Sequence, residues 1–273
     1  MSKELHINTI LAQAGIKSDE ATGALVTPLH FSTTYQHPEF GRSTGFDYTR
    51  TKNPTRSKAE EVLAAIESAD YALATSSGMS AIVLAFSVFP VGSKVLAVRD
   101  LYGGSFRWFN QVEQEGHFHF TYANTEEELI AELEKDVDVL YIETPTNPLM
   151  LEFDIEKLAK LAHAKGAKVV VAFLKDSPAV KEVLYTGRGG MISFKVADET
   201  RIPHILNSLK VFSFAESLGG VESLITYPTT QTHADIPAEV RHSYGLTDDL
   251  LRLSIGIEDA RDLIADLRQA LEG

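Results

Sequence analysis

The chain has 273 residues, enough for two modest domains or one large one, and its 44% hydrophobic and 23% charged residues are ordinary for a soluble globular protein. The formal net charge is −13 and no basic run occurs, which argues against nucleic acid or an anionic membrane surface as a partner. The absence of cysteine excludes disulfides and thiolate chemistry, so a reducing cytoplasm is the simplest expected location.

Residues 1–55 are expected to form an irregular arm. They contain no apolar signal core, and no helical period persists beyond 9–14. Near the end of the arm, Tyr48, Arg50 and Lys52 lie close together in the chain; Arg50 could clamp a phosphate or carboxylate, or be a solvated loop charge. An arm of this length without periodicity needs something to pack against, so we expect a neighbouring subunit to cover it.

An amphipathic helix is predicted at 56–67, followed by a short buried strand at 71–74 and an apolar helix at 81–89. A strand that turns tightly into a helix exposes the first N–H groups of that helix, which attract a phosphate together with the helix dipole. Gly78 allows close backbone approach, and Ser77 offers a further donor. The same residues equally suit an ordinary serine-rich N-cap.

Strands and helices then alternate, which predicts a parallel sheet flanked by helices. The predicted strands are 94–98, 119–122, 137–142 and 168–171, and the predicted helices are 105–115, 126–135 and 154–165. Open sheets of this kind bind ligands at the carboxyl ends of strands, where Tyr102 could stack on a flat ring and where 143–148 carries polar side chains. His117 and His119 would face one side of their strand with no third ligand nearby, so we expect no metal site.

The pattern changes after Val171, where apolar residues continue although a polar loop is expected. Beyond this point the sequence predicts a turn followed by an alternating strand within 187–196, a helix at 202–209, strands at 222–227 and 250–255, and a helix at 257–271. We therefore predict three parts: an arm (1–55), an incomplete α/β domain (56–172) and a C-terminal α+β domain (173–273).

Six blocks, in the same order along the chain, resemble the Cys/Met-metabolism enzymes that use pyridoxal 5′-phosphate (PLP). The blocks are 48–50, 76–79, 100–104, 143–148, 216–223 and 252–258. The nearest resemblance within the family is to the bacterial cystathionine γ-synthases and O-acetylhomoserine thiol-lyases. It implies a PLP-transferase type I (aminotransferase-like) α/β fold, here truncated, and a cytoplasmic dimer or homotetramer.

The resemblance also assigns the cofactor's surroundings residue by residue. The backbone of Gly78 and Met79, with Ser77 beside it, would hold the PLP phosphate, and Tyr48 and Arg50 would reach that phosphate from the neighbouring subunit. Tyr102 would stack on the pyridine ring as a catalytic residue, Asn147 would bond the ring's phenolic oxygen, and Glu143 would help shape that wall.

For the substrate, the resemblance implies that Ser217 and Arg252 hold the carboxylate, with Arg252 as the bidentate anchor. Glu216 would lie beside the side-chain end and influence which amino acid is accepted. Gly103 and Gly104 argue against a methionine γ-lyase, which carries a cysteine in this block.

Two residues that the family's chemistry requires are not found in the expected place. An aspartate normally pairs with the pyridinium nitrogen, and a lysine forms the Schiff base and moves the α-proton. Both belong to blocks that follow the strand corresponding to 168–171, and neither block occurs here, so we expect an internal deletion after about Val171. Lys175 lies near this seam but is expected to be a surface residue, and Lys168 and Lys195 have no better claim.

The implied ancestral activity is γ-replacement on an O-acylhomoserine with cysteine, giving cystathionine, and we expect this chain to be inactive or impaired. Cystathionine γ- or β-lyase activity is the alternative within the family. The alternative from another class is a non-catalytic deletion product or scaffold that assembles with intact copies. Since a deletion leaves sheet edges and apolar faces uncovered, we also expect marginal stability or aggregation of the chain alone.

Overall fold

The computed structural model describes residues 7–14, 22–172 and 190–272. The chain divides into two compact units, Met1–Ala81 and Ile82–Gly273, and the division falls inside helix α3 (Gly78–Phe86). Lys175 lies outside the described residues, so its expected surface position stays a prediction. The predicted domain limits at 55/56 and 172/173 also stay predictions.

In the first unit the arm is irregular, as the sequence predicts. Between α1 (Ile7–Ala12) and α2 (Pro54–Ile66), its described residues contain only isolated bridges, such as Thr34 with Tyr48. Helix α2 begins where the Asn53 side chain accepts the N–H groups of Thr55 at 2.8 Å and Arg56 at 3.3 Å. This is an N-cap followed by proline at the first helical position, a combination that favours a helix start.

The predicted strand at 71–74 is wrong. These residues form neither strand nor helix, and Tyr71 and Leu73 are 76% and 62% exposed. A strand is stable only when its backbone groups pair with a neighbour, and no described strand pairs with this segment. Helix α3 begins three residues before the predicted start. Its residue Phe86 is buried, but its residues Val83 and Leu84 are about 40% exposed. A helix apolar on all sides is typical of a buried position, so α3 has an uncovered apolar face.

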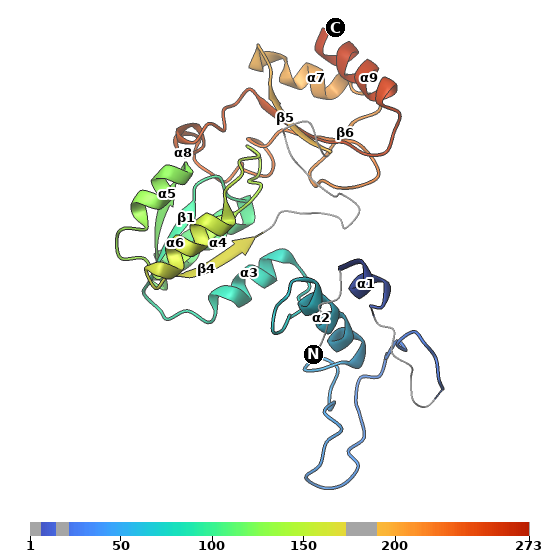
Figure 1. Cartoon of the computed structure of the whole chain (residues 1–273). Helices are drawn as coiled ribbons and strands as arrows, with labels where there is room; N and C mark the ends of the chain where they lie inside the picture. Colours follow the sequence, from blue (N-terminus) through green and yellow to red (C-terminus); the bar gives the residue numbers. More distant parts are fainter. Residues whose placement is uncertain (1–6, 15–21, 173–189, 273) are drawn as a thin grey trace. The chain divides into compact units, whose positions relative to one another are not determined.

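The second unit begins with the predicted parallel sheet. Its strands β1 (Ser93–Val98), β2 (Phe118–Ala123), β3 (Val139–Glu143) and β4 (Lys168–Ala172) lie in the order β2-β1-β3-β4. Helices α4 (Gly103–Gln114), α5 (Glu126–Glu132) and α6 (Ile155–Ala164) flank the sheet (Figure 1). The α/β fold class is confirmed, and β4 forms one edge among the described strands.

The core of this sheet is rich in aromatic side chains. Phe86 lies 5.2 Å from Phe109 and 5.7 Å from Tyr141 between ring centroids, and Phe109 stacks on Phe120 at 4.4 Å. Tilted, edge-on and offset arrangements of this kind are favourable for aromatic pairs. Through Phe109, this core packs α4 against β2 and β3.

A second, mixed sheet is formed by described residues after position 190. Strands β5 (Met191–Lys195), β6 (Ser213–Phe214), β7 (Leu224–Thr226) and β8 (Leu250–Ser254) lie in the order β5-β8-β7-β6. The helical elements are η1 (Glu199–Arg201), α7 (Ile202–Ser208), α8 (Ala238–Ser243) and α9 (Ala260–Glu272), with α7 and α9 side by side (Figure 1). The predicted α+β pattern is confirmed, whereas the sequence did not predict β6 or α8.

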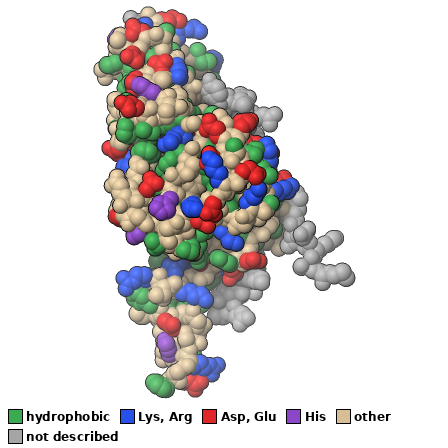
Figure 2. All heavy atoms as spheres, turned by 90° about the vertical axis from the view of Figure 1, so that its left-hand side faces the viewer, with side chains coloured by type: hydrophobic (Ala, Val, Ile, Leu, Met, Phe, Trp, Pro, Cys, Tyr) green, Lys and Arg blue, Asp and Glu red, His purple; other side chains and the backbone are tan. Residues whose placement is uncertain are grey.

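Positive and negative side chains are interspersed over the middle of the face that Figure 2 presents, with no broad patch of one sign there. Among the described residues, Lys157 pairs with Glu126 at 2.7 Å and Lys165 pairs with Glu134 at 2.6 Å. Within the described ranges, no helix combines the length and apolar character needed to cross a bilayer.

Candidate functional site

The carboxyl ends of β1 and β3 are neighbours, and the loops that leave them are hydrogen-bonded together. The Tyr102 N–H donates to Glu143 Oε2 at 2.6 Å, and the Leu149 N–H donates to Asp100 Oδ2 at 3.1 Å. The first bond fixes the residue at which α4 begins, because Tyr102 is its N-cap. The two predicted site blocks therefore meet at one edge of the parallel sheet, as expected for this topology.

Glu143 is fully buried and acts as an acceptor for three donors. Besides the Tyr102 N–H, it accepts the hydroxyl groups of Ser105 at 2.6 Å and Tyr141 at 2.8 Å. Burial raises the pKa of the Glu143 carboxyl above its ordinary value, while these hydrogen bonds oppose the rise. In this structure Glu143 holds the start of α4 in place; its predicted contact with a cofactor stays a prediction.

Asn147 lies in a tightly folded loop between β3 and α6. The peptide bonds Thr144–Pro145 and Asn147–Pro148 are both cis, and the Thr146 N–H donates to the Leu151 carbonyl at 2.9 Å. The loop is largely buried, and the Asn147 side chain is 7% exposed. Its amide oxygen faces the second sheet.

Arg252, in the middle of β8, joins the two sheets. Its guanidinium donates to Asn147 Oδ1 at 2.7 Å, to the Ser217 carbonyl at 2.9 Å and to Thr226 Oγ1 at 3.1 Å. Ser217 has a φ of +87°, which is rare for a residue with a side chain and is a form of strain that clusters at functional sites. Three predicted site residues, Asn147, Ser217 and Arg252, are thus brought together, while Glu216 lies exposed beside Ser217.

Two buried titratable residues at this site were not singled out by the sequence analysis. Burial raises the pKa of Asp100 to about 7, and its Oδ1 has no hydrogen-bond partner among the described residues. His233 has no exposed surface, and burial lowers its pKa to about 4, helped by the positive charges of Arg252 and Arg241. The sequence places Asp100 in a recognisable block but carries no signal for His233, whose Nε2 lies beside the carbonyls of Leu101 and Asn147, far away in the chain.

Comparison with known proteins decides the family. Residues 8–185 and 167–272 match the family described as Cys/Met metabolism PLP-dependent enzymes. This chain belongs to that family. It is 35% identical to the cystathionine gamma-synthase/O-acetylhomoserine (thiol)-lyase of Bacillus subtilis over 359 aligned positions, covering 97% of this chain and 96% of the relative. It is also 35% identical to the cystathionine gamma-synthase of Haemophilus influenzae, covering 99% of both chains.

Solved structures of the same family have the same fold. The cystathionine gamma synthase of Xanthomonas oryzae pv. oryzae, in complex with aminoacrylate and cysteine, superposes with a TM-score of 0.86 at 28% identity, covering 98% of both chains. The cystathionine gamma-lyase of Lactobacillus plantarum complexed with L-serine gives a TM-score of 0.83 at 25% identity, covering 98% of this chain and 99% of the other. The PLP-transferase type I fold is therefore shown.

The alignments also show an internal deletion. The Bacillus subtilis alignment spans 359 positions, whereas 97% of 273 residues is about 265, so about 94 positions of the alignment have no counterpart in this chain. The two family matches overlap at 167–185, the region that contains Val171. The deletion that we predicted after about Val171 is confirmed.

Family members depend on PLP, and the phosphate end of that cofactor fits the start of α3. Gly78 and Met79 are the first residues of this helix, whose first N–H groups have no carbonyl within the helix to bond to. Ser77 also acts as the ordinary N-cap, since its Oγ accepts the Ser80 N–H at 3.1 Å. The N-cap alternative is thus present together with a helix end that suits a phosphate.

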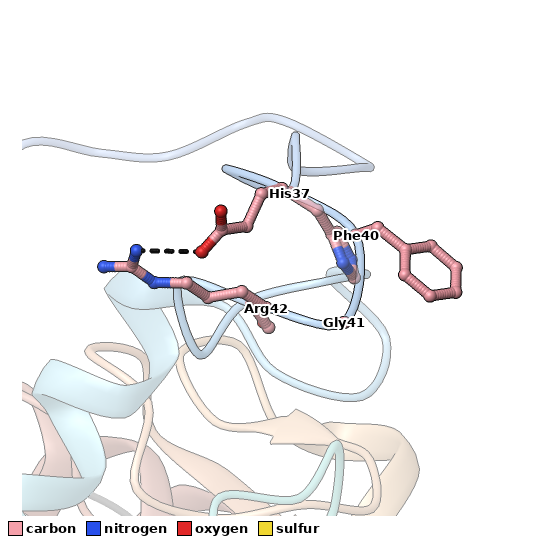
Figure 3. Close-up of a pocket in the computed structure, with 6 residues that line it drawn as sticks. His37, Phe40, Gly41 and Arg42 are labelled. Atoms are coloured by element: carbon pink, nitrogen blue, oxygen red, sulfur yellow. Dashed lines mark hydrogen bonds and ion pairs between the residues drawn. The ribbon is translucent and has the colours of Figure 1, made fainter.

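Tyr48 and Arg50 lie together in the arm, with the Arg50 guanidinium 5.1 Å from the centre of the Tyr48 ring. A hollow of about 570 Å³ elsewhere in the arm is lined by His37, Glu39, Phe40, Gly41, Arg42 and Ser43. Figure 3 shows the Phe40 ring pointing away from this hollow while Arg42 pairs with Glu39 at 3.1 Å. None of the predicted site residues lines it.

The two described lysines considered as substitutes, Lys168 and Lys195, both lie in strands. Lys168 is the first residue of β4 and pairs in register with Val139, at the amino end of the parallel strands. The Asn147 loop follows the opposite end. Lys195 is exposed at the end of β5, two register positions from the residue that pairs with Arg252. His117 and His119 are both exposed as well.

Proposed function

We propose that this chain is a transsulfuration-type relative that keeps the walls of a PLP and amino-acid site but cannot carry out the family's reaction. The observation that carries the proposal is the deletion of about 94 alignment positions at the end of β4. In the intact family this stretch would supply the Schiff-base lysine and the pyridinium-pairing aspartate. Bound PLP supplies an electron sink for the substrate's α-carbon, which depends on both residues.

We assign the phosphate of PLP to the backbone of Gly78 and Met79 with Ser77, and to Tyr48 and Arg50 of a neighbouring subunit. The free helix start and the closeness of Arg50 to Tyr48 support this assignment. The aromatic ring of the cofactor would lie against Tyr102, a half-buried side chain at the start of α4.

The remaining cofactor contacts would come from Asn147 and from the wall that Glu143 supports. We assign the substrate carboxylate to Arg252 and Ser217, and the side-chain end to Glu216. The hydrogen bonds that join Asn147, Ser217 and Arg252 support a single polar site. A guanidinium held by several acceptors keeps its orientation, so a carboxylate reaching it would find a fixed partner.

The relatives' names favour γ-replacement as the ancestral reaction: an O-acylhomoserine and cysteine would give cystathionine. A cystathionine gamma-lyase of Bacillus subtilis is also 31% identical over 97% of the chain, so a lyase ancestor is the alternative. In either case the molecule would be cytoplasmic and would assemble as a dimer or tetramer. Phe31 and Phe40 of the arm, 90% and fully exposed, support a role for the arm in assembly.

The test is a PLP titration followed by an activity assay, with the Bacillus subtilis relative as the intact control. We expect the control to show a visible absorbance band that borohydride fixes to a lysine and to turn over O-acylhomoserine with cysteine. We expect this chain to show neither. Turnover by this chain, or a stoichiometric band on one of its lysines, would refute the proposal.

A non-catalytic role in assembly is the second candidate, favoured by the exposed aromatic residues of the arm. If the chain assembles with intact copies, co-expression with the full-length relative and a pull-down should recover both chains in a fixed ratio. Recovery of this chain alone would exclude the assembly role.

A further inference from the structure

A short segment of the second sheet's long loop lies on both site loops of the first sheet. His233, between β7 and α8, is completely buried, and its Nε2 lies 3.1 Å from the Leu101 carbonyl oxygen and 3.0 Å from the Asn147 carbonyl oxygen. Both carbonyls can only accept, so Nε2 must carry the hydrogen. Nδ1, 2.7 Å from Thr232 Oγ1, then accepts from that hydroxyl.

The residues on either side of His233 touch the same helix start. A Cβ added to Gly103 would lie 2.1 Å from the Thr232 carbonyl oxygen, so the loop backbone packs directly on the first residue of α4. Arg107, one turn further along α4, donates to Asp235 Oδ2 at 2.9 Å. We call residues 232–235 the bridging segment.

We propose that His233 is a positioning residue for the cofactor site, which fixes Tyr102 and Asn147 relative to each other through the carbonyls of Leu101 and Asn147. This inference rests on the proposed function, because Tyr102 and Asn147 are assigned there to PLP, Tyr102 to the face of its ring and Asn147 to its phenolic oxygen. The His233 N–H is shared by two carbonyls and so connects two loops that follow neighbouring strands. Side chains of these same two loops are the ones assigned to PLP.

A merely structural role would lower the stability of the whole unit without a particular effect on ligand binding. A positioning role makes a further prediction. Loss of the shared N–H should increase the mobility of both loops together, while the stability of the second sheet (β5 to β8) stays unchanged. Because the two loops approach the ligand from different strands, their relative movement weakens PLP binding more than an equal loss of stability elsewhere.

The experiment compares four chains: the wild type, His233→Leu, His233→Gln and Leu263→Ala. Leucine fills the volume without a donor, whereas the glutamine amide nitrogen reaches about as far as Nε2 and keeps the donor. Leu263 is 5% exposed in the core of the second sheet, so its truncation lowers stability without touching either loop. PLP affinity is measured by quenching of Trp108, the single tryptophan, which lies on α4.

We expect His233→Leu to bind PLP at least about tenfold more weakly than Leu263→Ala, and His233→Gln to bind within about threefold of wild type. Amide exchange is measured in parallel. His233→Leu should exchange at least about tenfold faster in peptides covering both 101–106 and 144–151, with no such change in β8. Equal affinity and equal exchange in His233→Leu and Leu263→Ala would overturn the inference.

The test still gives an answer if His233→Leu does not fold or if the wild type does not bind PLP. If His233→Leu does not fold, His233→Asn replaces it, because the shorter asparagine amide cannot reach both carbonyls; equal exchange in the Gln and Asn variants then overturns the inference. If wild type does not bind PLP, the proposed cofactor site fails on its own, and the exchange of the two loops still decides whether His233 fixes them.

Discussion

Asp100 gives the sharpest test of the electrostatics at the strand ends. Its side chain is 2% exposed at the end of β1, and Oδ2 accepts the Leu149 N–H while Oδ1 has no hydrogen-bond partner among the described residues. Burial raises the pKa of this carboxyl from 3.8 to about 7, hydrogen bonding from Thr146 and Leu149 opposes the rise, and the nearby Glu143 charge adds to it. A buried carboxylate with one unpaired oxygen is costly, so the folded state favours the protonated form.

The direction of the pH dependence follows from this difference. Between about pH 4 and pH 7 the folded chain keeps a proton on Asp100 that the unfolded chain has lost, so the free energy of unfolding falls as the pH rises through this window. A difference of about three pKa units corresponds to about 4 kcal/mol at most. Asparagine is always neutral and avoids this loss, but its second amide hydrogen lacks an acceptor, which costs about 1 kcal/mol.

We therefore expect Asp100→Asn to be more stable than wild type by about 3 kcal/mol at pH 8, and equal to it within about 1 kcal/mol at pH 4.5. Urea unfolding at both pH values, followed by Trp108 fluorescence, measures the difference. Asp70→Asn, at an exposed aspartate, removes the same charge and serves as the control. An Asp100→Asn variant that is less stable than wild type at pH 8, or whose advantage is the same at both pH values, would refute the reasoning.

Further predictions concern the contacts that hold the site together. Glu143→Gln should cost less than about 1 kcal/mol, because the two hydroxyl partners can turn to accept, whereas Glu143→Leu leaves three donors without an acceptor and should cost about 3 kcal/mol or more in urea unfolding. Gly103→Ala should lower the melting temperature by several degrees, since the new methyl group meets a backbone carbonyl; an unchanged melt contradicts the close contact. Arg252→Lys should lose about 2 kcal/mol, because one ammonium cannot reach three separated acceptors; equal stability would show that they are not shared. Because the pKa of His233 falls from 6.5 to about 4 on folding, its contribution to stability should be lost as the pH drops from 6.5 towards 4, and His233→Gln should remove this part of the profile.

Elements whose signal is local could be predicted from the sequence. The four parallel strands and the helices between them follow from apolar runs and periodicity, and their order follows from alternation along the chain. The segment 71–74 has the same local signal and forms no strand, because a strand also needs a neighbour. The local sequence does not show whether a neighbouring strand is present. The deletion at the end of β4 removes residues that the intact relatives have.

The site residues also divide into those that a local sequence pattern indicates and those that depend on contacts distant in the chain. The motif blocks that resemble the family singled out Asn147, Ser217 and Arg252, and their roles in binding stay predictions. Nothing local predicted that Arg252 would donate to Asn147, 105 residues away, or that His233 would reach Leu101 across 132 residues. Such contacts depend on how two sheets pack together, so only the folded structure reveals them.

We propose that the fold of a PLP-dependent enzyme is present in this chain without the lysine amine that captures the cofactor. The most direct measurement is peptide mass mapping after the chain has been incubated with PLP, reduced with borohydride and digested. We expect no lysine of this chain to carry the reduced cofactor in stoichiometric amount, and the intact Bacillus subtilis relative to carry it at one lysine. Stoichiometric labelling of a single lysine in this chain, Lys175 included, would show that the chain still holds an amine that captures PLP.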